Sequence, residues 1–179
     1  MFSGLTDGTC EAAVELIKPV LELGAFKRTD GQLIVLDPSR PYTKDFEDLE
    51  REIAAGDEEA LRKFWLEVVL NEWDFGDKAN WEHPYDFVAA SKAFISWRTG
   101  LPSHMVQQLY PYLYKQGDTK WGGSTVLPGG LVIAFSGVEW YYDQMIAEMM
   151  GSAIKAVCLA GMKPVLADDS ITFLGDHLG

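Results

Sequence analysis

Apolar side chains recur three or four positions apart in six segments of the chain, so each segment would present one apolar face to a core as a helix. Glycine, proline or a Ser, Thr or Asp side chain stands at most of the boundaries, as is typical of helix ends. Pro19 predicts a kink in the first segment. The sequence predicts helices over about residues 9–23, 43–55, 57–68, 84–99, 103–116 and 138–153.

Two further stretches have the pattern of β-hairpins. Residues 25–37 read as two short strands around Thr29-Asp30-Gly31, because an Asp-Gly pair supplies the positive φ angles of a tight turn. Residues 124–127 and 131–135 flank a Pro-Gly-Gly turn, and the second strand is apolar throughout, so it must be covered on both faces. Residues 71–84 are aromatic and polar without a period, and we expect a loop there.

The order of these elements predicts the fold class. Hairpins joined by helices give an antiparallel sheet with helices packed against it, which is an α+β domain. A length of 179 residues fits one such domain, residues 1–179. Within it we expect a helical, acidic insertion over about residues 38–84 and a C-terminal tail over about residues 162–179. Ile171–Leu174 in the tail is interpreted as a short strand or as an arm onto a neighbouring subunit.

Charge is distributed unevenly along the chain. The formal net charge is −12, which repels phosphate backbones and anionic membranes, so we expect neither nucleic acid nor a membrane as a partner. Residues 43–86 account for −9 of this charge and are interpreted mainly as a solvated helical face. Residues 87–138 carry a local charge of +3, which makes this stretch the place to search for a small anionic ligand.

Several observations bear on location. The N-terminal segment lacks a basic stretch followed by an uncharged apolar one, and no apolar run approaches the roughly 18 residues that span a bilayer. Cys10 and Cys158 are far apart and lack metal-ligand spacing, so we expect free thiols rather than a disulfide or a zinc site. The sequence therefore predicts a soluble, cytoplasmic protein without a metal site.

Strong catalytic motifs are absent from the sequence. It contains no phosphate-binding glycine loop, no zinc-protease motif and no nucleophile elbow, and it has only three histidines. His104 lies near a predicted helix start, where its ring could reach a ligand or stay on the surface. His83 lies among Asp74, Asp77 and Asp86, which we interpret as a solvated helix start rather than a metal loop. The acid–base candidates are Glu139, Asp143 and His104.

The candidate ligand-binding residues lie in the mildly basic stretch and just after it. Aromatic residues make up 12% of the chain, more than a core of this size needs, so some rings could line a cleft. A cation set among aromatic rings can hold a carboxylate, and paired glycines allow a planar ligand to approach the backbone. Such residues are Lys92, Trp97, Arg98, Trp121, Gly122 and Gly123.

The residues that follow the second hairpin have two interpretations. Ser136-Gly137-Val138-Glu139 has the form of a capping box, in which Ser136 and Glu139 satisfy the backbone at a helix start. The same helix start offers free N–H groups and a positive dipole end that could seat an anion, with Ser136 and Gly137 in contact with it. Lys92 likewise reads either as a ligand-binding cation or as a surface side chain.

Several short motifs, taken in order, resemble the GlcG/HbpS-like superfamily. They are Ser91-Lys92-Ala93 on a helix, Gly122-Gly123 before a hairpin, Phe135-Ser136-Gly137-Val138 after it, and Asp143 on the closing helix. This superfamily includes the haem-degrading domain family, the C-terminal domain of PduO-type proteins and the UPF0303 proteins. The resemblance covers about residues 87–160 and extends more weakly to residues 13–37.

The resemblance implies a profilin-like fold, assembly into homo-oligomers and, for some members, binding of haem or a corrinoid. No residue of this chain maps onto a haem axial ligand.

Three hypotheses for the function follow. The first is a module that binds a flat anionic molecule such as haem. The second is a small enzyme that uses the acid–base candidates on the same scaffold. The third is an oligomeric structural protein, in which the Trp-rich insertion and the tail form subunit contacts.

Overall fold

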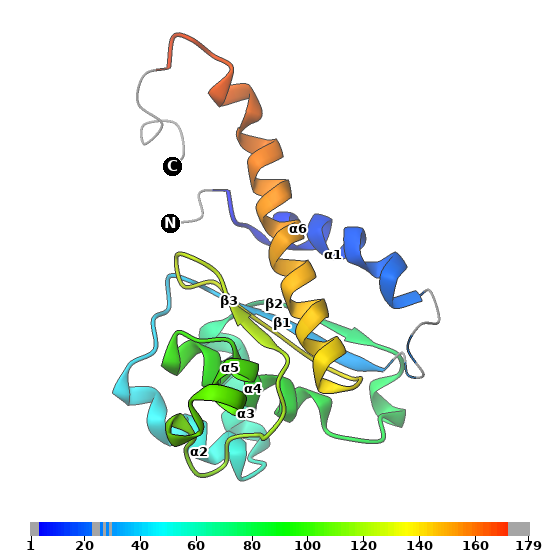
Figure 1. The fold of residues 1–179 in the computed structure, drawn as a ribbon, viewed down its shortest axis with the longest axis vertical. Helices are drawn as coiled ribbons and strands as arrows, with labels where there is room; N and C mark the ends of the chain where they lie inside the picture. Colours follow the sequence, from blue (N-terminus) through cyan, green and yellow to red (C-terminus); the bar gives the residue numbers. More distant parts are fainter. Residues whose placement is uncertain (1–3, 23–25, 27, 29, 172–179) are drawn as a thin grey trace.

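The computed structural model describes residues 4–22, 26, 28 and 30–171, which form an α+β domain (Figure 1). Its described part contains six α-helices, three short 3-10 helices and one four-stranded antiparallel sheet. In chain order the helices and strands are α1 Asp7–Glu22, β1 Gly31–Leu36, α2 Glu47–Ala54, α3 Glu58–Val68, β2 Val69–Phe75, α4 Tyr85–Thr99, α5 Ser103–Leu109, β3 Ser124–Val126, β4 Val132–Ser136 and α6 Trp140–Leu166.

The strand order is β2-β1-β4-β3, and it confirms one predicted hairpin and overturns the other. β3 and β4 pair around the Pro-Gly-Gly turn as expected. β1 pairs antiparallel with β2 on one side and with β4 on the other. The second strand of the predicted hairpin over residues 25–37 is present as β1, but both of its edges are filled by β2 and β4, so its pairing with the preceding residues is wrong. Of those preceding residues, 25, 27 and 29 lie outside the described residues.

β2 replaces part of the predicted loop over residues 71–84. Trp73 and Phe75 pack against the α1 and α6 side of the sheet, whereas Glu72 and Asp74 point to the other side and are exposed. This is the two-residue alternation of a strand, in a stretch whose Asn, Asp and Glu side chains are depleted in strands generally. The segment predicted as a helical insertion over residues 38–84 thus also contributes an edge strand to the sheet.

Two apolar layers cover the sheet (Figure 1). Leu33 and Val35 of β1 point into a core shared with α1 and α6, whereas Ile34 and Leu36 point into a core shared with α2, α3 and α4. β4 is buried on both faces, as its apolar sequence predicts. The beginnings of α4 and α6 therefore lie on opposite sides of the sheet, and both lie near the end of β4.

Four of the six predicted helices agree with the structure to within about four residues at each end. The helix predicted over 103–116 ends at Leu109, and the one predicted over 138–153 extends to Leu166. Of the side chains expected to cap helices, Thr43 makes no cap hydrogen bond. Asp57 caps α3 by accepting hydrogen bonds from the N–H groups of Glu59 and Ala60. Ser103 is the first residue of α5 rather than its cap, and its hydroxyl accepts a hydrogen bond from the N–H of Ser124. The capping box is also wrong, because Ser136 ends β4 and the Glu139 side chain makes no cap hydrogen bond.

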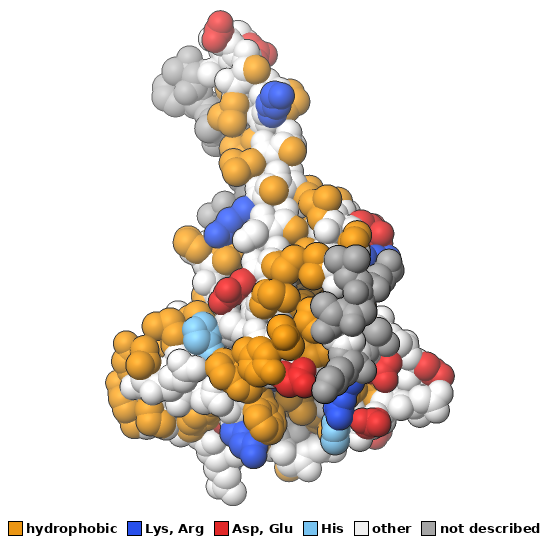
Figure 2. Space-filling view, turned by 45° about the vertical axis from the view of Figure 1, so that its right-hand side comes forward, with side chains coloured by type: hydrophobic (Ala, Val, Ile, Leu, Met, Phe, Trp, Pro, Cys, Tyr) orange, Lys and Arg blue, Asp and Glu red, His pale blue; other side chains and the backbone are white. Residues whose placement is uncertain are grey.

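α6 is 27 residues long and is the one helix, among the described residues, that is long and apolar enough to cross a membrane. Its first half packs on the sheet and buries Asp143, Ile146 and Met150, as a core helix does. Its second half projects from the body, and apolar side chains lie along it (Figures 1 and 2). Residues 162–166 of the predicted tail belong to this helix, and residues 172–174 of the predicted arm lie outside the described residues.

Candidate functional site

A cavity of about 470 Å³ lies between the first half of α4, the end of β4 and the beginning of α6. This volume is within the range of about 300–1,000 Å³ that is usual for sites of small organic ligands. The chain brings four separate segments to it, and aromatic rings and polar groups both contribute to the wall. The lining residues are Arg28, His83, Pro84, Tyr85, Val88, Lys92, Trp121, Ser136, Gly137, Val138, Glu139, Trp140, Tyr141 and Asp143.

Simple periodicities bring these side chains together. Tyr85, Val88 and Lys92 are three and four positions apart, so they share one face of α4. Ser136 follows Val132 and Ala134 in the alternation of β4, so its side chain points to the α4 side of the sheet. The Ser136 side chain is 4% exposed and makes no hydrogen bond to any described residue. A hydroxyl of the cavity wall is thus free to bind a ligand.

Lys92 and Asp143 form a buried ion pair in the wall of the cavity. The Lys92 Nζ donates to Asp143 Oδ2 at 2.6 Å and to the Phe135 carbonyl at 2.9 Å, and both charged side chains are at most 3% exposed. The other carboxylate oxygen, Asp143 Oδ1, accepts the N–H of Val138 at 3.0 Å. The pair therefore joins α4, the end of β4 and the beginning of α6.

Burial shifts the pKa values of both partners in the direction that favours their uncharged forms. Burial lowers the pKa of Lys92 even though Asp143 beside it has the opposite effect. Burial also raises the pKa of Asp143, against the influence of Lys92 and of the N–H groups of Val138 and Gly137. Both shifts act in the same direction, toward a neutral amine beside a protonated carboxyl group.

The glycine pair before β3 serves this ion pair. Gly123 has a φ of +130°, and a Cβ there would lie 2.7 Å from Asp143 Cβ and 2.9 Å from Lys92 Nζ. A Cβ on Gly122 would lie 3.0 Å from both His104 Cβ and a ring atom of Trp140. Neither glycine lines the cavity, so both act by allowing close packing behind its wall. His104 also lies outside the cavity, and its Nδ1 is buried without a partner.

Arg28 and Tyr85 form part of the cavity rim on the side of α4. The Arg28 guanidinium donates to the Tyr85 hydroxyl at 3.5 Å and lies 3.4 Å from a Glu82 carboxylate oxygen. Arg28 is exposed, and His83 packs edge to face against the Tyr85 ring. Sequence reasoning missed Arg28, Tyr85 and Val88, although the helical spacing of Tyr85 and Val88 with Lys92 was available as a signal.

Two predicted ligand residues, Trp97 and Arg98, lie away from the cavity. Trp97 packs against Phe46 and Phe64 in the core beneath α2 and α3, and its ring N–H donates to the Arg40 carbonyl. Arg98 is 9% exposed and pairs with the carboxylates of Glu50 and Asp118. Their placement in the site is therefore wrong, and the reason is that both side chains serve the packing of the insertion onto α4.

Most of the locally basic stretch is neutralised in the folded chain. Lys92 pairs with Asp143, Arg98 with Glu50 and Asp118, and Lys115 lies within 4 Å of Glu47 and Glu50. Lys120 lies over the Trp121 ring, 4.6 Å from its centroid. The local charge of +3 is therefore not an open basic patch, and Arg28 at the rim is the exposed cation of the cavity wall.

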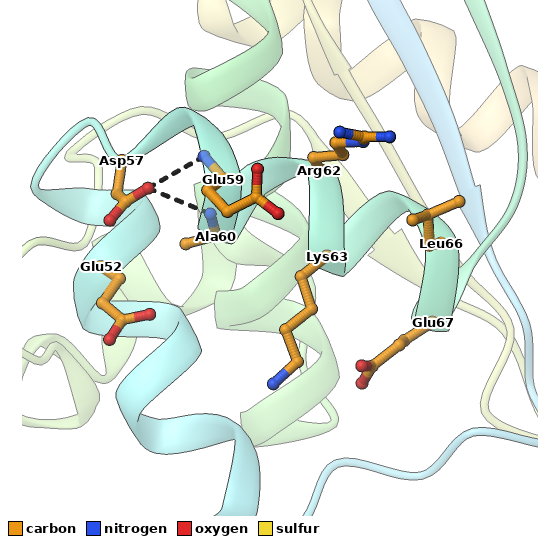
Figure 3. Close-up of a pocket in the computed structure, with 8 residues that line it drawn as sticks. All are labelled: Glu52, Asp57, Glu59, Ala60, Arg62, Lys63, Leu66 and Glu67. Atoms are coloured by element: carbon orange, nitrogen blue, oxygen red, sulfur yellow. Dashed lines mark hydrogen bonds between the residues drawn. The ribbon is translucent and has the colours of Figure 1, made fainter.

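A second pocket of about 460 Å³ lies along α2 and α3 (Figure 3). Figure 3 shows side chains of both charges, including Glu52, Lys63 and Glu67, spread along its wall, and these side chains are exposed. The one contact drawn among them is the helix cap made by Asp57. This pocket is the solvated acidic face that the charge pattern predicts, and it offers no buried polar group to a ligand.

The cavity wall offers few side chains that could ligate a haem iron. Among the described residues that line it, His83 is the only imidazole and is exposed, and no Cys or Met is present. Of its two tyrosines, Tyr85 already accepts a hydrogen bond from Arg28, and Tyr141 is half exposed. No group of three or more His, Cys, Asp or Glu side chains in the described part of the chain is placed to hold a metal ion. Asp77 instead caps a 3-10 helix, and Asp86 pairs with Lys78.

Comparisons with known proteins give no family assignment. No protein-family model matches the chain, and neither the curated proteins nor the solved structures include a significant match.

Proposed function

We propose that the protein is a ligand-binding module of the GlcG/HbpS-like type that holds a flat, anionic organic molecule in the cavity between α4 and α6. The observation that carries this proposal is the composition of the wall. Aromatic rings of Tyr85, Trp121, Trp140 and Tyr141 surround a few convergent polar groups, and one of these belongs to Ser136, which is 4% exposed and makes no side-chain hydrogen bond to a described residue. Cavities of this kind bind small organic ligands.

The wall supplies a different interaction to each part of such a ligand. Trp121 is 45% exposed and Tyr141 50% exposed, which is unusual for large rings, and both line the cavity, where a planar molecule can stack on them. Arg28 offers a guanidinium at the rim to a carboxylate. The ligand we infer therefore places its ring system against the aromatic wall and its acidic group near Arg28.

A titration with naphthoate, a flat aromatic carboxylate, tests this proposal. Trp121 and Trp140 line the cavity, so we expect a saturable change in tryptophan fluorescence. Trp121→Ala should weaken binding by about tenfold, because a stacked ring contributes roughly 1–3 kcal/mol. Tyr112→Ala removes a ring that is 77% exposed and outside the cavity, and it should leave binding unchanged. Absence of saturable binding would contradict the proposal.

Haemin is a second probe, which separates the ligand classes. The poor set of axial ligands in the wall leads us to expect no saturable shift of the Soret band. A saturable shift that His83→Ala abolishes would instead identify haem as the ligand. Binding of naphthoate without haemin supports a smaller organic acid as the physiological ligand.

An acid–base enzyme on the same scaffold is the second candidate function. It is favoured by the presence of both Glu139 and Asp143 in the cavity wall, where a bound molecule could exchange a proton with either carboxylate. His104 is no longer part of this hypothesis, because it lies outside the cavity. Glu139 is exposed and free of a cap role, so Glu139→Gln should abolish turnover of a candidate substrate without loss of stability.

We also propose that the chain self-associates. The projecting half of α6 exposes Leu159 by 61% and Leu166 by 57%, and a single helix gains little stability without a packed apolar face (Figure 2). Light scattering at micromolar concentration should give the mass of an oligomer, and Leu159→Glu should reduce it. A monomer in the unaltered protein would contradict this part of the proposal.

A further inference from the structure

Lys92 has a property that simple ligand binding does not require. Among the described residues of the cavity wall, it supplies the single primary amine, and its side chain is 1% exposed. Its Nζ is held by two acceptors, Asp143 Oδ2 at 2.6 Å and the Phe135 carbonyl at 2.9 Å. A tetrahedral amine held by two N–H bonds has a fixed orientation, because it cannot rotate about its last bond without breaking one of them.

The surroundings of Lys92 favour the neutral, nucleophilic amine. Burial lowers the pKa of Lys92 and raises that of Asp143, and both shifts favour transfer of a proton from the ammonium to the carboxylate. Burial of a lysine in an apolar site is one way in which proteins activate an amine toward carbonyl compounds. Asp143 is itself fixed by the Val138 N–H, so the proton acceptor stays in place.

We propose that Lys92 captures an aldehyde or ketone group of the bound molecule as an imine, with Asp143 as the group that takes and returns the proton. The inference rests on the proposed ligand-binding function and specifies the ligand class as a flat anionic carbonyl compound. A surface lysine lacks both the burial and the fixed partner that Lys92 has.

The chemical step balances without an oxidant or reductant. Asp143 accepts a proton from the Lys92 ammonium, and the amine lone pair forms a C–N bond to the carbonyl carbon. The carbonyl oxygen becomes a hydroxyl by taking that proton back from Asp143. One of the two protons left on the nitrogen then passes through Asp143 to the hydroxyl, which leaves as water. The products are a protonated imine, which keeps the last proton beside the Asp143 carboxylate, and one water molecule.

Gly123 allows the Lys92 amine and Asp143 to pack closely behind the cavity wall. A Cβ at this position would lie 2.9 Å from the Lys92 Nζ and 2.8 Å from the Phe135 carbonyl oxygen that orients it. The Gly123 N–H also donates to Gln144, which lies one residue after Asp143 on α6. The glycine thus fixes the beginning of α6 near the amine without filling the space around it.

The test is reductive trapping on the full chain. A formyl-substituted naphthoate is incubated with the protein at neutral pH, cyanoborohydride is added, and the modified lysine is identified by peptide mass spectrometry. We expect at least about tenfold more adduct at Lys92 than at any other lysine, because the cavity holds the bound carbonyl compound next to this amine. Prior saturation with methyl-substituted naphthoate, which lacks the carbonyl, should suppress the adduct.

Two variants control the experiment. Lys92→Arg keeps a cation beside Asp143 but cannot form an imine, so the adduct should be lost from a protein that circular dichroism shows to be folded. Lys63→Arg removes an exposed amine on α3 and should leave the adduct at Lys92 unchanged. If Lys92→Arg fails to fold, the site of the adduct in the unaltered protein still decides the question.

The outcomes distinguish this inference from the function on which it rests. Binding of methyl-substituted naphthoate together with an adduct spread over exposed lysines would overturn the inference and leave the ligand-binding proposal standing. Absence of both binding and a Lys92 adduct would overturn both. An adduct confined to Lys92 and suppressed by the carbonyl-free naphthoate supports both.

Discussion

The Oδ2 atom of Asp143 lies 2.6 Å from the Nζ atom of Lys92, and this contact joins the beginning of α6 to the middle of α4 across the end of β4. Both side chains are almost completely buried, so neither charge can be satisfied by bulk water. The relationship has two consequences, because the same pair holds two layers of the fold together and supplies the polar part of the cavity wall.

Asp143→Asn should destabilise the protein by roughly 3–5 kcal/mol, because it leaves a buried lysine without its counter-charge. Urea unfolding followed by circular dichroism measures this loss. The double variant Lys92→Met with Asp143→Leu removes both charges and should recover most of the lost stability. An unfolding midpoint of Asp143→Asn equal to that of the unaltered protein would show that the pair is not a structural link.

Gly123→Ala should destabilise the chain more than Gly130→Ala, although both glycines have positive φ angles. A Cβ at Gly130 meets nothing within 4 Å, so that variant carries only the backbone strain of about 1 kcal/mol. A Cβ at Gly123 would also lie within 3.0 Å of Asp143, the Phe135 carbonyl and Lys92. Thermal unfolding of the two variants gives the comparison, and equal losses would contradict the packing role of Gly123.

Arg98→Met should lower stability without changing ligand affinity. Arg98 bridges Glu50 and Asp118, and its removal leaves the nearly buried Asp118 without its cation and Glu50 with Lys115 alone, at a cost of roughly 3–5 kcal/mol. Arg98 does not line the cavity, so the dissociation constant of naphthoate should stay the same. Weaker naphthoate binding by a folded Arg98→Met protein would show that Arg98 does contribute to the binding site.

The titration of Glu72 should lower the free energy of unfolding as the pH rises through the range from about 4.5 to about 7. The Glu72 residue as a whole is exposed, but partial desolvation of its carboxyl group and the neighbouring Asp74 raise its pKa to about 7 in the folded chain, from 4.5 without that environment. In this range the folded state holds a proton that the unfolded state has released, so raising the pH favours unfolding.

Glu72→Gln cannot titrate and should flatten this dependence, which urea midpoints at acidic and neutral pH would measure. Glu59→Gln removes an exposed charge on α3 and is the matched control. A pH dependence that is the same in Glu72→Gln and in Glu59→Gln would exclude Glu72 as its source.

The predictable part of the fold follows from local signals. The helical faces, the Asp57 cap and the second hairpin are encoded within a few residues, so periodicity and turn chemistry predict them. β2 was missed because Glu72 and Asp74 are poor strand formers, and its place in the sheet depends on pairing with β1, which lies some forty residues earlier in the chain. The Asp-Gly pair predicted a hairpin, but both edges of β1 are filled by distant strands.

The site was predictable only in part, for a related reason. Lys92, Trp121, Ser136 and Asp143 were candidates by residue type, and the structure gathers them at one cavity. Arg98 and Trp97 matched the same description. Their partners Glu50 and Phe46, however, come from the acidic segment, and no local sequence pattern predicts contacts over that distance along the chain. Arg28 was missed because its role depends on the distant Tyr85.

The central claim is that the cavity between α4 and α6 binds a small flat anion, and one titration tests it most directly. Val88 lines the cavity from α4, so Val88→Trp should fill it, whereas Leu66→Trp adds the same ring at an exposed position on α3. Naphthoate should bind the unaltered protein and Leu66→Trp with the same dissociation constant and should not bind folded Val88→Trp. Equal binding by all three proteins would contradict the account.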